Sequence, residues 1–567
     1  MFFIDMKFGD KMFKNPKMFI SYSHDSPVHM RWVSELAAKL RKNGVQIIFD
    51  QWHFNSANDP KQFMEFGVKN SDWILVICTD SYVGKANDGE DSIGYEPMII
   101  TQKLVEDLGT NKFIPIIRQT EWEDKTPEFL KNRVYIDFTD DTQFDAKFEE
   151  LLHERLLLPP LQIPLIPHIE ALGIKNYRAL RDVELKQLKP LTVLLGANGS
   201  GKSTFFDVFA FLAECFTDGL RRALDKREGF KELRTRGCNG PIEFELKYRE
   251  EPGTPIITYH LSINENAEGP FVETEWMQWR RGSHGKHVRF LNFHHGKGSV
   301  IPGETPDKTD TPINEQLDDP TTIAASMFGQ SAHHPRVSAF RRFITDWHLS
   351  RLSTDATHQA TNDGAQKRLS AIGDNLANVI QYLQEKYPER LEKIISSLSN
   401  QVPRLEKVDT ELTMSGRRRL QIKDAPFEQP ILAKFASDGT LKLLSYLTLF
   451  HNPRPPQLIG IEEPENYLHP RLLTGLVGEC LEVLMFSQLI ITTHSPHLVN
   501  ELSAEEVWVL YRDEQGFTVC KRASDMLGVE QLLDAGAKLG KLWMEGYFEF
   551  GDPLTNAGGP KRELHAH

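Results

Sequence analysis

Short apolar runs alternate with amphipathic stretches through the first 150 positions of the chain. Four of these runs have the length and near-continuous hydrophobicity of strands that are buried on both faces. The stretch from Val28 to Leu40 instead repeats its apolar residues at helical spacing. Buried strands separated by amphipathic helices are typical of a parallel sheet with crossover helices, so the sequence predicts an α/β unit. The predicted strands are Met18 to Ser21, Val45 to Phe49, Trp73 to Cys78 and Phe113 to Ile117.

A proline-rich stretch follows this unit. Four prolines fall within the ten residues from Leu158 to Pro167, and proline is excluded from helix interiors and central strands. The composition therefore predicts a semi-rigid linker, and a second α/β pattern begins at Ile169. The expected division is 17–150 for the first domain, 156–168 for the linker, 169–551 for the second domain and 552–567 for a tail.

A phosphate-binding motif opens the second domain. The apolar strand Leu191 to Leu195 leads into GANGSGKST and then into an apolar helix predicted from Phe205 to Leu212. This is the GxxxxGK[ST] spacing in its required strand–loop–helix context. Backbone N–H groups of such a loop surround phosphates, its lysine reaches the β- and γ-phosphates, and the following hydroxyl ligates Mg²⁺. The predicted contact residues are Asn198, Gly199, Gly201, Lys202, Ser203 and Thr204.

Two later strands end in candidate catalytic side chains. The strand from Leu458 to Ile461 is followed by Glu462 and Glu463. One such acid can hold Mg²⁺ and the next can polarise the attacking water, although two glutamates alone are more often a solvated strand end. The strand from Gln488 to Thr493 delivers His494. A histidine there can contact a γ-phosphate, but a lone histidine is more often structural.

Between these strands lies a candidate signature segment. Ala436 to Thr440 precedes an apolar helix predicted from Leu441 to Leu447. In this order, the motifs resemble the ABC ATPases of the SMC and RecF type, and most closely the prokaryotic AAA-like ATPases of that group. The resemblance implies an α/β P-loop domain that forms a homodimer, in which each protomer binds ATP and the partner's Ser437 and Gly439 close over the γ-phosphate.

The resemblance also assigns roles by position. It implies that Ser203 and Glu462 hold Mg²⁺, that Glu463 is the general base and that His494 contacts the γ-phosphate. Glu462 stands where the family usually has Asp, and Asp438 and Thr440 stand where the common signature has Gly and Gln. With these departures, the resemblance still implies ATP binding, but it does not imply a particular rate of ATP hydrolysis.

The segment between the phosphate loop and the signature, about 215–430, lacks the long heptad repeat of an SMC coiled coil. Its best helical stretch, Asn375 to Leu398, is interrupted by Pro388. The polar run from Ile301 to Pro320 is typical of an exposed loop. We therefore expect this insertion to fold as one compact lobe.

The first domain carries a second resemblance. MFISYSHDS at Met18 to Ser26, VQIIFDQW at Val45 to Trp52, and the strand from Asp72 to Cys78 followed by Ser81 and Tyr82 resemble the first three strands of TIR and SEFIR domains. The resemblance implies a flavodoxin-like fold. In the catalytic branch of the TIR family, it also implies cleavage of the nicotinamide–ribose bond of NAD⁺.

That cleavage needs a carboxylate, because a nearby negative charge stabilises an oxocarbenium-like transition state. By position the residue is Glu96, with the segment from Ser21 to Asp25, Ser21 and Tyr22 foremost, and the loop from Asp50 to Asn55 shaping the dinucleotide pocket. On position alone Glu96 would be a favourable first-turn acid of a helix, and the family resemblance favours the catalytic role instead. The family's usual Trp-Cys pair before this glutamate is replaced by Ile93-Gly94-Tyr95, and SEFIR-like domains can act purely as self-association modules.

Charge, cysteine content and hydropathy limit the partners and the cellular compartment that can be expected for this chain. The net charge of −13 disfavours indiscriminate nucleic-acid binding, although Arg417 to Arg419 can be either a local phosphate-binding patch or a solvated loop. Five widely spaced cysteines without a CxxC pair argue against a disulfide framework or a zinc ribbon. No apolar run is long enough to span a membrane, and charged residues interrupt the apolar N-terminus. We expect a cytoplasmic protein with no membrane partner.

Two hypotheses of different class remain. In the first, an ATPase sensor gates an NAD⁺-consuming enzyme, an arrangement that looks like bacterial antiphage defence with a phage-derived trigger or an accessory protein. In the second, the TIR-like domain is a non-enzymatic assembly scaffold and the ATPase acts on nucleic acid. Both involve dimerisation through the ATPase domains and higher-order assembly through the TIR-like domains.

Overall fold

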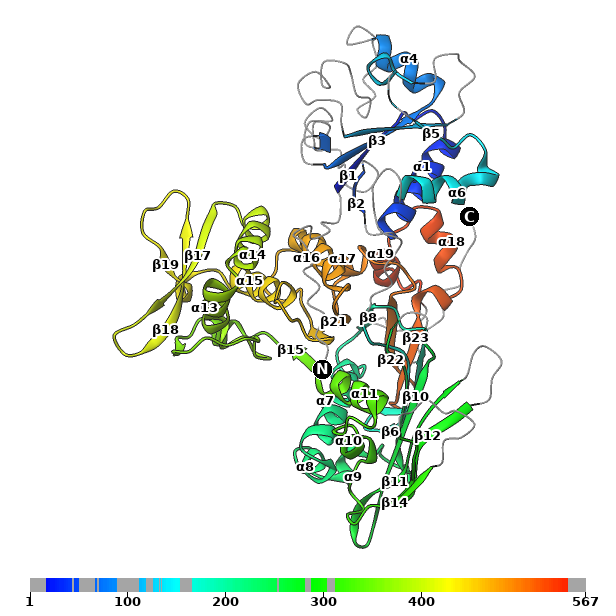
Figure 1. The fold of residues 1–567 in the computed structure, drawn as a ribbon. Helices are drawn as coiled ribbons and strands as arrows, with labels where there is room; N and C mark the ends of the chain where they lie inside the picture. Colours follow the sequence, from blue (N-terminus) through cyan, green and yellow to red (C-terminus); the bar gives the residue numbers. More distant parts are fainter. Residues whose placement is uncertain are drawn as a thin grey trace. The chain divides into compact units, whose positions relative to one another are not determined.

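The computed structural model describes residues 17–42, 45–49, 67–68, 71–88, 112–118, 126–131, 133, 135–152, 166–251, 254–280, 287–302 and 312–548. The chain divides into two compact units, Met1–Gln162 and Ile163–His567, whose elements are labelled in Figure 1. The division falls within the predicted linker, of which only residues 166–168 are among the described residues.

The first unit is built on a five-stranded sheet of order β2-β1-β3-β4-β5. Every neighbouring pair is parallel, and this strand order is that of flavodoxin-like folds. The predicted α/β unit is therefore confirmed. Its elements are β1 (Lys17–Ser21), α1 (Pro27–Lys42), β2 (Gln46–Ile48), β3 (Trp73–Cys78), α4 (Asp80–Asp88), β4 (Phe113–Ile117), β5 (Ile136–Asp137) and α6 (Phe144–Glu150).

Both faces of this sheet are buried, which explains why most positions of its strands are apolar. Along β1, Met18 and Ile20 belong to one core cluster and Phe19 to the other. Leu75 and Ile74 divide in the same way along β3. Alternate side chains of a strand point to opposite faces, so a sheet covered on both sides needs apolar residues at every position.

The second unit contains a six-stranded sheet of order β15-β20-β21-β8-β22-β23. The first five strands are parallel, and β23 pairs antiparallel with β22. The carboxyl ends of β8, β20 and β21 therefore meet at one edge of the sheet. The strands are β8 (Leu191–Gly196), β15 (Trp347–Ser350), β20 (Leu458–Glu462), β21 (Gln488–Thr493), β22 (Val507–Arg512) and β23 (Thr518–Arg522).

The two faces of this sheet carry different helices. Leu194 shares a core cluster with residues of α7 (Lys202–Thr217). Val193 and Leu195, on the other face, share a second cluster with α15 (Asp438–Phe450) and α16 (Pro470–Val483). The helix that follows the phosphate loop and the helix that begins at the signature segment thus lie on opposite sides of one sheet.

An eight-stranded antiparallel sheet of order β14-β13-β12-β11-β10-β9-β6-β7 adjoins this core (Figure 1). Alternating burial along β9 is typical of a sheet with one covered face, and α7 and α11 (Pro335–Thr345) contribute to the cluster that covers it. The strands are β6 (His168–Tyr177), β7 (Leu180–Lys186), β9 (Ile242–Arg249), β10 (Ile257–Asn266), β11 (Gly269–Arg280), β12 (His287–His294), β13 (Lys297–Val300) and β14 (Ile313–Gln316).

A smaller lobe joins two helices to a second antiparallel sheet. Its helices are α13 (Leu376–Lys386) and α14 (Pro388–Gln401), and the break at Pro388 confirms the predicted interruption. Its sheet contains β16 (Thr361–Asn362), β17 (Leu405–Leu412), β18 (Arg417–Asp424) and β19 (Ile431–Leu432). The shorter helices of the second unit are α8 (Leu220–Asp225), α9 (Phe230–Leu233), α10 (Ala324–Phe328), α12 (Thr354–Thr357), α17 (Pro496–Val499), α18 (Val529–Asp534) and α19 (Leu539–Met544).

The expected single lobe over about 215–430 is wrong. Strands β9–β14 extend the sheet of β6 and β7, whereas residues 361–432 build the small lobe. The two parts bury their apolar faces against opposite sides of the ATPase sheet, which a reading of the linear sequence does not reveal. The polar run ending at Pro320 also contains the exposed edge strand β14, so it is not loop throughout.

Candidate functional site

The phosphate loop connects the carboxyl end of β8 to the start of α7. Gly199 and Gly201 have φ angles of 76° and 113°, a left-handed conformation that side chains with a Cβ rarely adopt. A Cβ on Gly201 would also lie 2.4 Å from Oγ1 of Thr518. These two glycines are therefore required by the backbone. Asn198, Gly199 and Ser203 are exposed at the loop and Thr204 is half-buried.

Lys202 is buried under this loop. Its Nζ donates to the carbonyl oxygens of Gly196 at 2.8 Å and Ala197 at 3.1 Å. Burial lowers the pKa of Lys202, while the nearby Glu463, Glu465 and Glu462 act to raise it. The ammonium group is thus fixed by main-chain oxygens at the start of α7, which is where it can compensate phosphate charge.

The hairpin of β22 and β23 donates two hydrogen bonds to carbonyl oxygens of the phosphate loop, a feature that the sequence analysis missed. Arg512 Nε donates to the carbonyl oxygen of Gly199 at 2.6 Å. Thr518 Oγ1 donates to the carbonyl oxygen of Ser200 at 2.8 Å. Because a trans peptide directs its N–H opposite to its C=O, the second bond turns the N–H of Gly201 away from the hairpin. No local pattern marks either residue, since the contact depends on pairing between β8 and β22.

The hydroxyl of Ser203 and the carboxylate of Glu462 meet at the edge of the sheet. Ser203 Oγ donates to Glu462 Oε1 at 2.8 Å, although 259 positions separate the two residues. Glu462 Oε2 pairs with Nε of Arg351 at 2.6 Å, a residue that the sequence analysis did not single out. Hydroxyl and carboxylate oxygens are the hard donors that Mg²⁺ prefers, so the adjacent Ser203 and Glu462 fit the metal position expected for them.

Glu463, the expected general base, lies beside His494, the histidine expected to contact the γ-phosphate. Its Oε1 is 2.8 Å from Nε2 of His494, and its Oε2 accepts a bond from Asn466 Nδ2 at 3.0 Å. The backbone of Glu463 has a φ angle of 45°, a left-handed conformation that is costly for a residue with a side chain. Its N–H donates to the carbonyl oxygen of Thr492 at 3.0 Å. Strand β21 therefore fixes both the main chain and the side-chain partner of this glutamate.

Two further charged residues complete the site and were missed by the sequence analysis. Glu465 Oε1 accepts bonds from Thr493 Oγ1 at 2.8 Å and from the N–H of His494 at 2.7 Å. Lys442, on α15, donates to the carbonyl oxygen of Glu463 at 3.3 Å. Burial lowers the pKa of Lys442 to about 8, although Glu465 and Glu463 act to raise it.

The signature segment forms the N-terminus of α15. Ser437 is the N-cap, and its Oγ accepts a bond from the N–H of Thr440 at 3.2 Å. His358 holds the following residue, because its Nε2 lies 2.8 Å from Oδ1 of Asp438 and its Nδ1 lies 2.9 Å from the carbonyl oxygen of Ala433. Gly439 packs closely against the next loop, since a Cβ there would lie 2.8 Å from the carbonyl oxygen of Tyr467. Ser437 itself is exposed.

In the first unit, two of the residues expected to shape the dinucleotide pocket lie in the interior. Ser21 and Tyr22 are both fully buried. The hydroxyl of Ser21 lies 2.7 Å from that of Tyr82, and the ring of Tyr22 lies in the core 5.5 Å from that of Phe49. Their burial follows from β1 being central in a sheet that is covered on both faces. Glu96 and the loop from Asp50 to Asn55 lie outside the described residues.

Polar side chains do gather at the carboxyl ends of β1 and β3. Thr79 Oγ1 donates to Oδ2 of Asp25 at 2.5 Å and lies 3.1 Å from Oγ of Ser23. His29 is only 4% exposed, and neither ring nitrogen has a hydrogen-bond partner among the residues that the structure describes. Burial lowers the pKa of His29, while Asp25 acts to raise it. This is the edge at which ligands bind in open α/β sheets.

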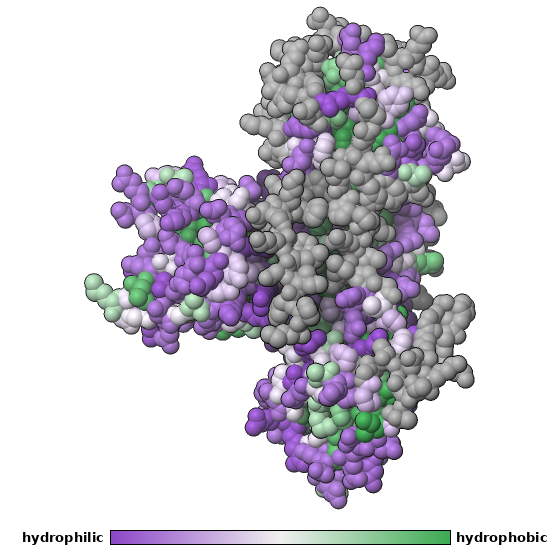
Figure 2. Space-filling view, in the orientation of Figure 1, coloured by the Kyte–Doolittle hydropathy of each residue, from purple (hydrophilic) through white to green (hydrophobic). Residues whose placement is uncertain are grey.

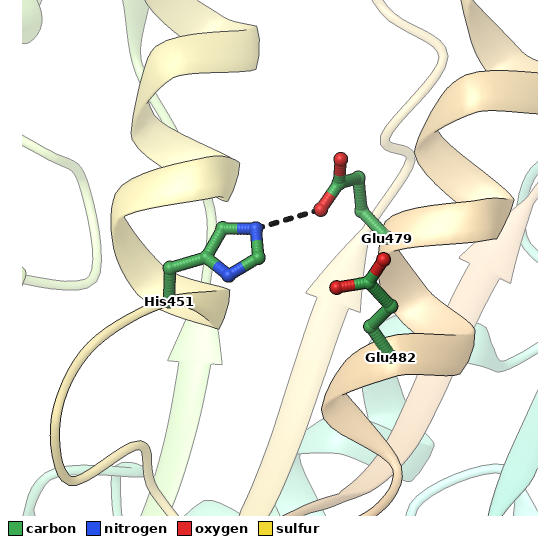
Figure 3. A group of neighbouring side chains, drawn as sticks. All are labelled: His451, Glu479 and Glu482. Carbon is green, nitrogen blue, oxygen red and sulfur yellow. Dashed lines mark hydrogen bonds and ion pairs between the residues drawn. The ribbon is translucent and has the colours of Figure 1, made fainter. Parts of the chain in front are cut away.

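An apparent metal-ligand group is formed by residues that do not belong to the candidate ATP site. His451 follows α15, and Glu479 and Glu482 lie one turn apart on α16 (Figure 3). Nε2 of His451 contacts Oε2 of Glu479 at 2.7 Å. Glu482 is already paired with Lys393 at 3.0 Å. The lysine supplies positive charge locally, so we interpret this group as an ionic contact between α14, α15 and α16.

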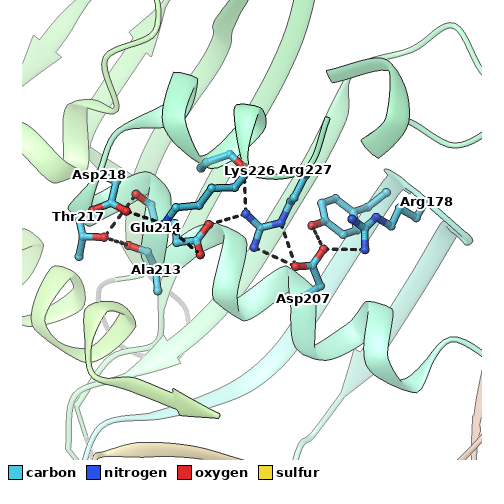
Figure 4. Close-up of polar contacts among 10 residues, drawn as sticks. Arg178, Asp207, Ala213, Glu214, Thr217, Asp218, Lys226 and Arg227 are labelled. Atoms are coloured by element: carbon cyan, nitrogen blue, oxygen red, sulfur yellow. Dashed lines mark hydrogen bonds and ion pairs between the residues drawn. The ribbon is translucent and has the colours of Figure 1, made fainter. Parts of the chain in front are cut away.

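A second ionic network braces the phosphate helix from its far side (Figure 4). Asp207 on α7 accepts a bond from the Tyr177 hydroxyl at 2.7 Å and pairs with Arg178 at 3.0 Å. Arg227 contacts the same carboxylate at 2.9 Å and also binds Glu214. Burial acts to lower the pKa of Arg227, but these two acids raise it above its usual value. The network ties α7 to the turn between β6 and β7 and so stabilises the helix that carries Lys202.

The basic run on the small lobe lies on strand β18 and is not a solvated loop. Arg418 pairs with Asp363 at 2.7 Å and Arg419 with Glu411 at 2.9 Å. Figure 2 shows a largely hydrophilic surface over this lobe. Two of the three guanidinium groups are therefore engaged by acids, which weakens the run as a phosphate-binding patch.

Comparison with known families identifies both halves of the chain. A model of the TIR domain matches residues 18–152. A model described as "AAA ATPase domain" matches residues 168–299, and one described as "AAA domain, putative AbiEii toxin, Type IV TA system" matches residues 312–500. The chain joins a TIR domain to an AAA-type ATPase domain. The expected resemblance and fold class are thus confirmed, with the phosphate loop, Glu462, Glu463 and the signature all inside the ATPase matches.

Individual relatives resemble parts of the chain. The Septu protein PtuA of Bacillus thuringiensis is 28% identical over 114 residues, which span 17% of this chain and 26% of PtuA. The chain thus matches about a quarter of that relative's length. Among solved structures, a prokaryotic SEFIR domain is 39% identical over 24% of this chain and 95% of its own, with a TM-score of 0.23. The SMC head domain from Thermotoga maritima is 13% identical over 63% of this chain and 98% of its own, with a TM-score of 0.29.

Two further expectations concern the whole chain. All five cysteines are free, and Cys78, Cys215 and Cys480 are buried. Among the described residues, no helix combines the length and the apolar character that crossing a membrane requires.

Proposed function

We propose that the ATPase domain binds and hydrolyses ATP as a homodimer, and that its nucleotide state controls NAD⁺ cleavage by the TIR domain in antiphage defence. The observation that carries the ATPase part is the meeting of four motif residues at one sheet edge. Ser203 lies 2.8 Å from Glu462, and Glu463 lies 2.8 Å from His494.

Each residue of the ATP site has a defined task in this proposal. Lys202 compensates the charge of the β- and γ-phosphates, and the N–H groups of the phosphate loop orient them. Ser203 and Glu462 hold Mg²⁺, which supplies charge compensation between the phosphates. Glu463 accepts hydrogen bonding from the attacking water, while His494 and Asn466 fix the direction of its carboxylate.

Dimerisation is supported by the position of the signature. Ser437 is exposed at the N-terminus of α15, on the face of the sheet opposite to α7. The N-terminus of a helix attracts phosphate, because its free N–H groups and its dipole favour an anion. A second protomer's signature can therefore complete the ATP site, which makes ATP binding and dimerisation one event.

The NAD⁺-cleaving part of the proposal is supported by the TIR match and by the polar edge of the first sheet. The edge carries Ser23, Asp25 and Thr79 in one hydrogen-bonded group. The candidate carboxylate is Glu96, as the family pattern implies. The match to part of a Septu protein supports a role in defence.

The decisive experiment compares wild type with Glu96→Gln, which preserves shape and removes charge. We expect NAD⁺ consumption in the presence of ATP to fall to background, because the oxocarbenium-like transition state loses its counter-charge. The ATPase rate should stay at the wild-type level, since the substitution lies in another domain. Release of nicotinamide, measured by chromatography, provides the readout.

Retained nicotinamide release in Glu96→Gln would contradict the assignment of Glu96. Failure of the wild type itself to consume NAD⁺, with or without ATP, would favour the alternative of a non-enzymatic TIR scaffold on an ATPase that acts on nucleic acid. In that case ATPase stimulation by DNA or RNA becomes the measurement that identifies the function.

A further inference from the structure

Lys442 is an unusual residue for its position. It lies on α15, two residues after Thr440 of the signature, and its side chain is only 3% exposed. Lysine is almost never fully buried unless its charge is compensated. None of the ion pairs formed among the described residues involves Lys442, so its compensation comes from elsewhere.

The ammonium group of Lys442 is directed at the segment that follows strand β20, which ends at Glu462. Its Nζ donates to the carbonyl oxygen of Glu463 at 3.3 Å. The same nitrogen lies 5.8 Å from the ring centre of Tyr467 and 5.9 Å from that of Tyr446. The field of Glu465 and Glu463 also favours its charged form. A buried cation on the signature helix is thus held by the loop that carries the candidate general base.

That loop needs support at Glu463. The φ angle of Glu463 is 45°, a strained conformation for a non-glycine residue that the surroundings must hold in place. Strand β21 binds its N–H through the carbonyl oxygen of Thr492. Lys442 binds its C=O. The main chain of the base is therefore held on one side by the ATPase sheet and on the other by the signature helix.

A second contact connects the same two segments. Gly439 of the signature approaches the carbonyl oxygen of Tyr467 so closely that a Cβ would lie 2.8 Å from it. Shifting the start of α15 therefore displaces the loop from Glu463 to Leu468, or loses these contacts. No flexible side chain intervenes at Gly439 to absorb such a shift.

We propose that Lys442 is a positioning residue for ATP hydrolysis that links the signature to the general base of the same protomer. This rests on the proposed ATP-bound dimer, in which the signature faces the partner's ATP and Glu463 faces the protomer's own ATP. Engagement of the signature then fixes the main chain of Glu463 through Lys442. The consequence is that the two ATP sites of the dimer hydrolyse ATP cooperatively.

The test compares the full-length wild type with Lys442→Met, which keeps the apolar stem and removes the donor, and with Lys442→Arg, which keeps a donor and the charge. For Lys442→Met we expect kcat to fall about tenfold or more while KM for ATP changes by less than about twofold, because positioning acts on the transition state. The Hill coefficient for ATP should fall to that of independent sites. Lys442→Arg should recover part of kcat and of the cooperativity.

Lys393→Met is the matched control, because it removes a half-buried lysine that pairs with Glu482 outside the site. It should leave kcat and the Hill coefficient unchanged. A Lys442→Met protein with wild-type kcat and cooperativity would overturn the proposal. Equal losses of kcat and of cooperativity in Lys442→Met and Lys442→Arg would also overturn it, provided that both variants melt at the wild-type temperature.

Two outcomes separate this inference from the proposed function. If the wild type hydrolyses ATP only as a monomer, the proposed dimer is wrong, and so is the cooperativity between its two ATP sites. If the wild type dimerises with ATP and Lys442→Met lowers only the affinity for ATP, the proposed function stands and the positioning role of Lys442 is wrong. If Lys442→Met lowers the melting temperature, kcat and the Hill coefficient of both proteins are measured at a temperature well below the unfolding of either, under the same criteria.

Discussion

Glu275 on β11 is fully buried. Its carboxylate accepts bonds from the N–H groups of Ala324 at 2.6 Å and Ala325 at 2.9 Å, and from the hydroxyl of Tyr259 at 3.1 Å. It thereby satisfies two N–H groups at the start of α10, which have no partner within the helix. Burial raises the pKa of Glu275 to about 7, although these three donors act to lower it.

The raised pKa predicts a pH-dependent stability. The folded protein keeps the proton of Glu275 to a higher pH than the unfolded chain does, so this residue's stabilising contribution is present below about pH 4.5 and is lost as the pH rises to about 7. Glu275→Gln does not titrate, so the melting temperature of the variant relative to wild type should rise across this interval. Thermal unfolding at several pH values measures the difference.

Glu273→Gln, at a half-buried position of the same strand, serves as the control. A constant difference between Glu275→Gln and wild type from pH 5 to pH 8 would contradict the prediction. The amide that Glu275→Gln introduces also places an NH₂ group near one of the two N–H donors. An overall offset in melting temperature is therefore expected and does not bear on the slope.

Among the elements, β21 joins two sheets through a single side chain. Gln488 begins this strand and is fully buried. Its Oε1 accepts a bond from the N–H of Ile169 at 2.8 Å, and its Nε2 donates to the carbonyl oxygen of Ile169 at 2.9 Å. The side-chain amide thus pairs with β6 as a neighbouring strand would, and it ties the start of the ATPase domain to its catalytic sheet.

Removing that amide is predicted to destabilise the ATPase domain. Gln488→Ala leaves the buried N–H and C=O of Ile169 without partners, which costs about 1–3 kcal/mol. Gln488→Glu keeps an acceptor and loses the donor, so its effect depends on the protonation of the new carboxyl group. Urea unfolding followed by tryptophan fluorescence reports the change, with Gln515→Ala in an exposed turn as the control. A midpoint equal to that of the wild type would show that the amide adds nothing to stability.

On the scale of the whole molecule, one chain carries an ATPase domain and a TIR domain on either side of a proline-rich segment. Tethering restricts the volume that two domains can explore and so raises their effective concentration. If ATP closes two ATPase domains into a dimer, two TIR domains are brought together by the same step. NAD⁺ cleavage is then set by the proximity of the TIR domains.

This coupling predicts the behaviour of Glu463→Gln. The substitution removes the candidate base and leaves Ser203 and Glu462 in place, so ATP binding should persist while hydrolysis slows. We expect a longer-lived dimer or larger assembly with ATP and NAD⁺ cleavage at or above the wild-type rate. Light scattering and nicotinamide release measure the two effects on one sample, and Lys202→Ala is the control that lacks ATP binding.

Two results would contradict the proximity mechanism. One is a Glu463→Gln protein that binds ATP and stays monomeric. The other is a dimeric Glu463→Gln protein whose NAD⁺ cleavage falls to the level of Glu96→Gln, which would make hydrolysis itself the activating step.

The sequence by itself determined the features that are encoded within a few neighbouring residues. Trp73 to Cys78 is apolar without a break, and Gln488 to Thr493 has an apolar centre from Leu489 to Ile491. Both are strands with the predicted bounds. The left-handed glycines of the phosphate loop and the helix break at Pro388 likewise follow from the backbone limits of single residues. Local sterics and burial suffice to predict such features.

Only the tertiary structure decided which side chains meet. Arg351 reaches Glu462, Thr518 reaches the phosphate loop, and Lys442 reaches Glu463, and none of these polar residues stands out from its neighbours along the chain. Their contacts arise because strands and a helix from distant parts of the chain are packed together around one edge of the sheet. The same cause buries Ser21 and Tyr22, since β1 is central in its sheet. Side-chain proximity depends on strand order, and strand order is set by how the apolar faces of all the elements are buried together.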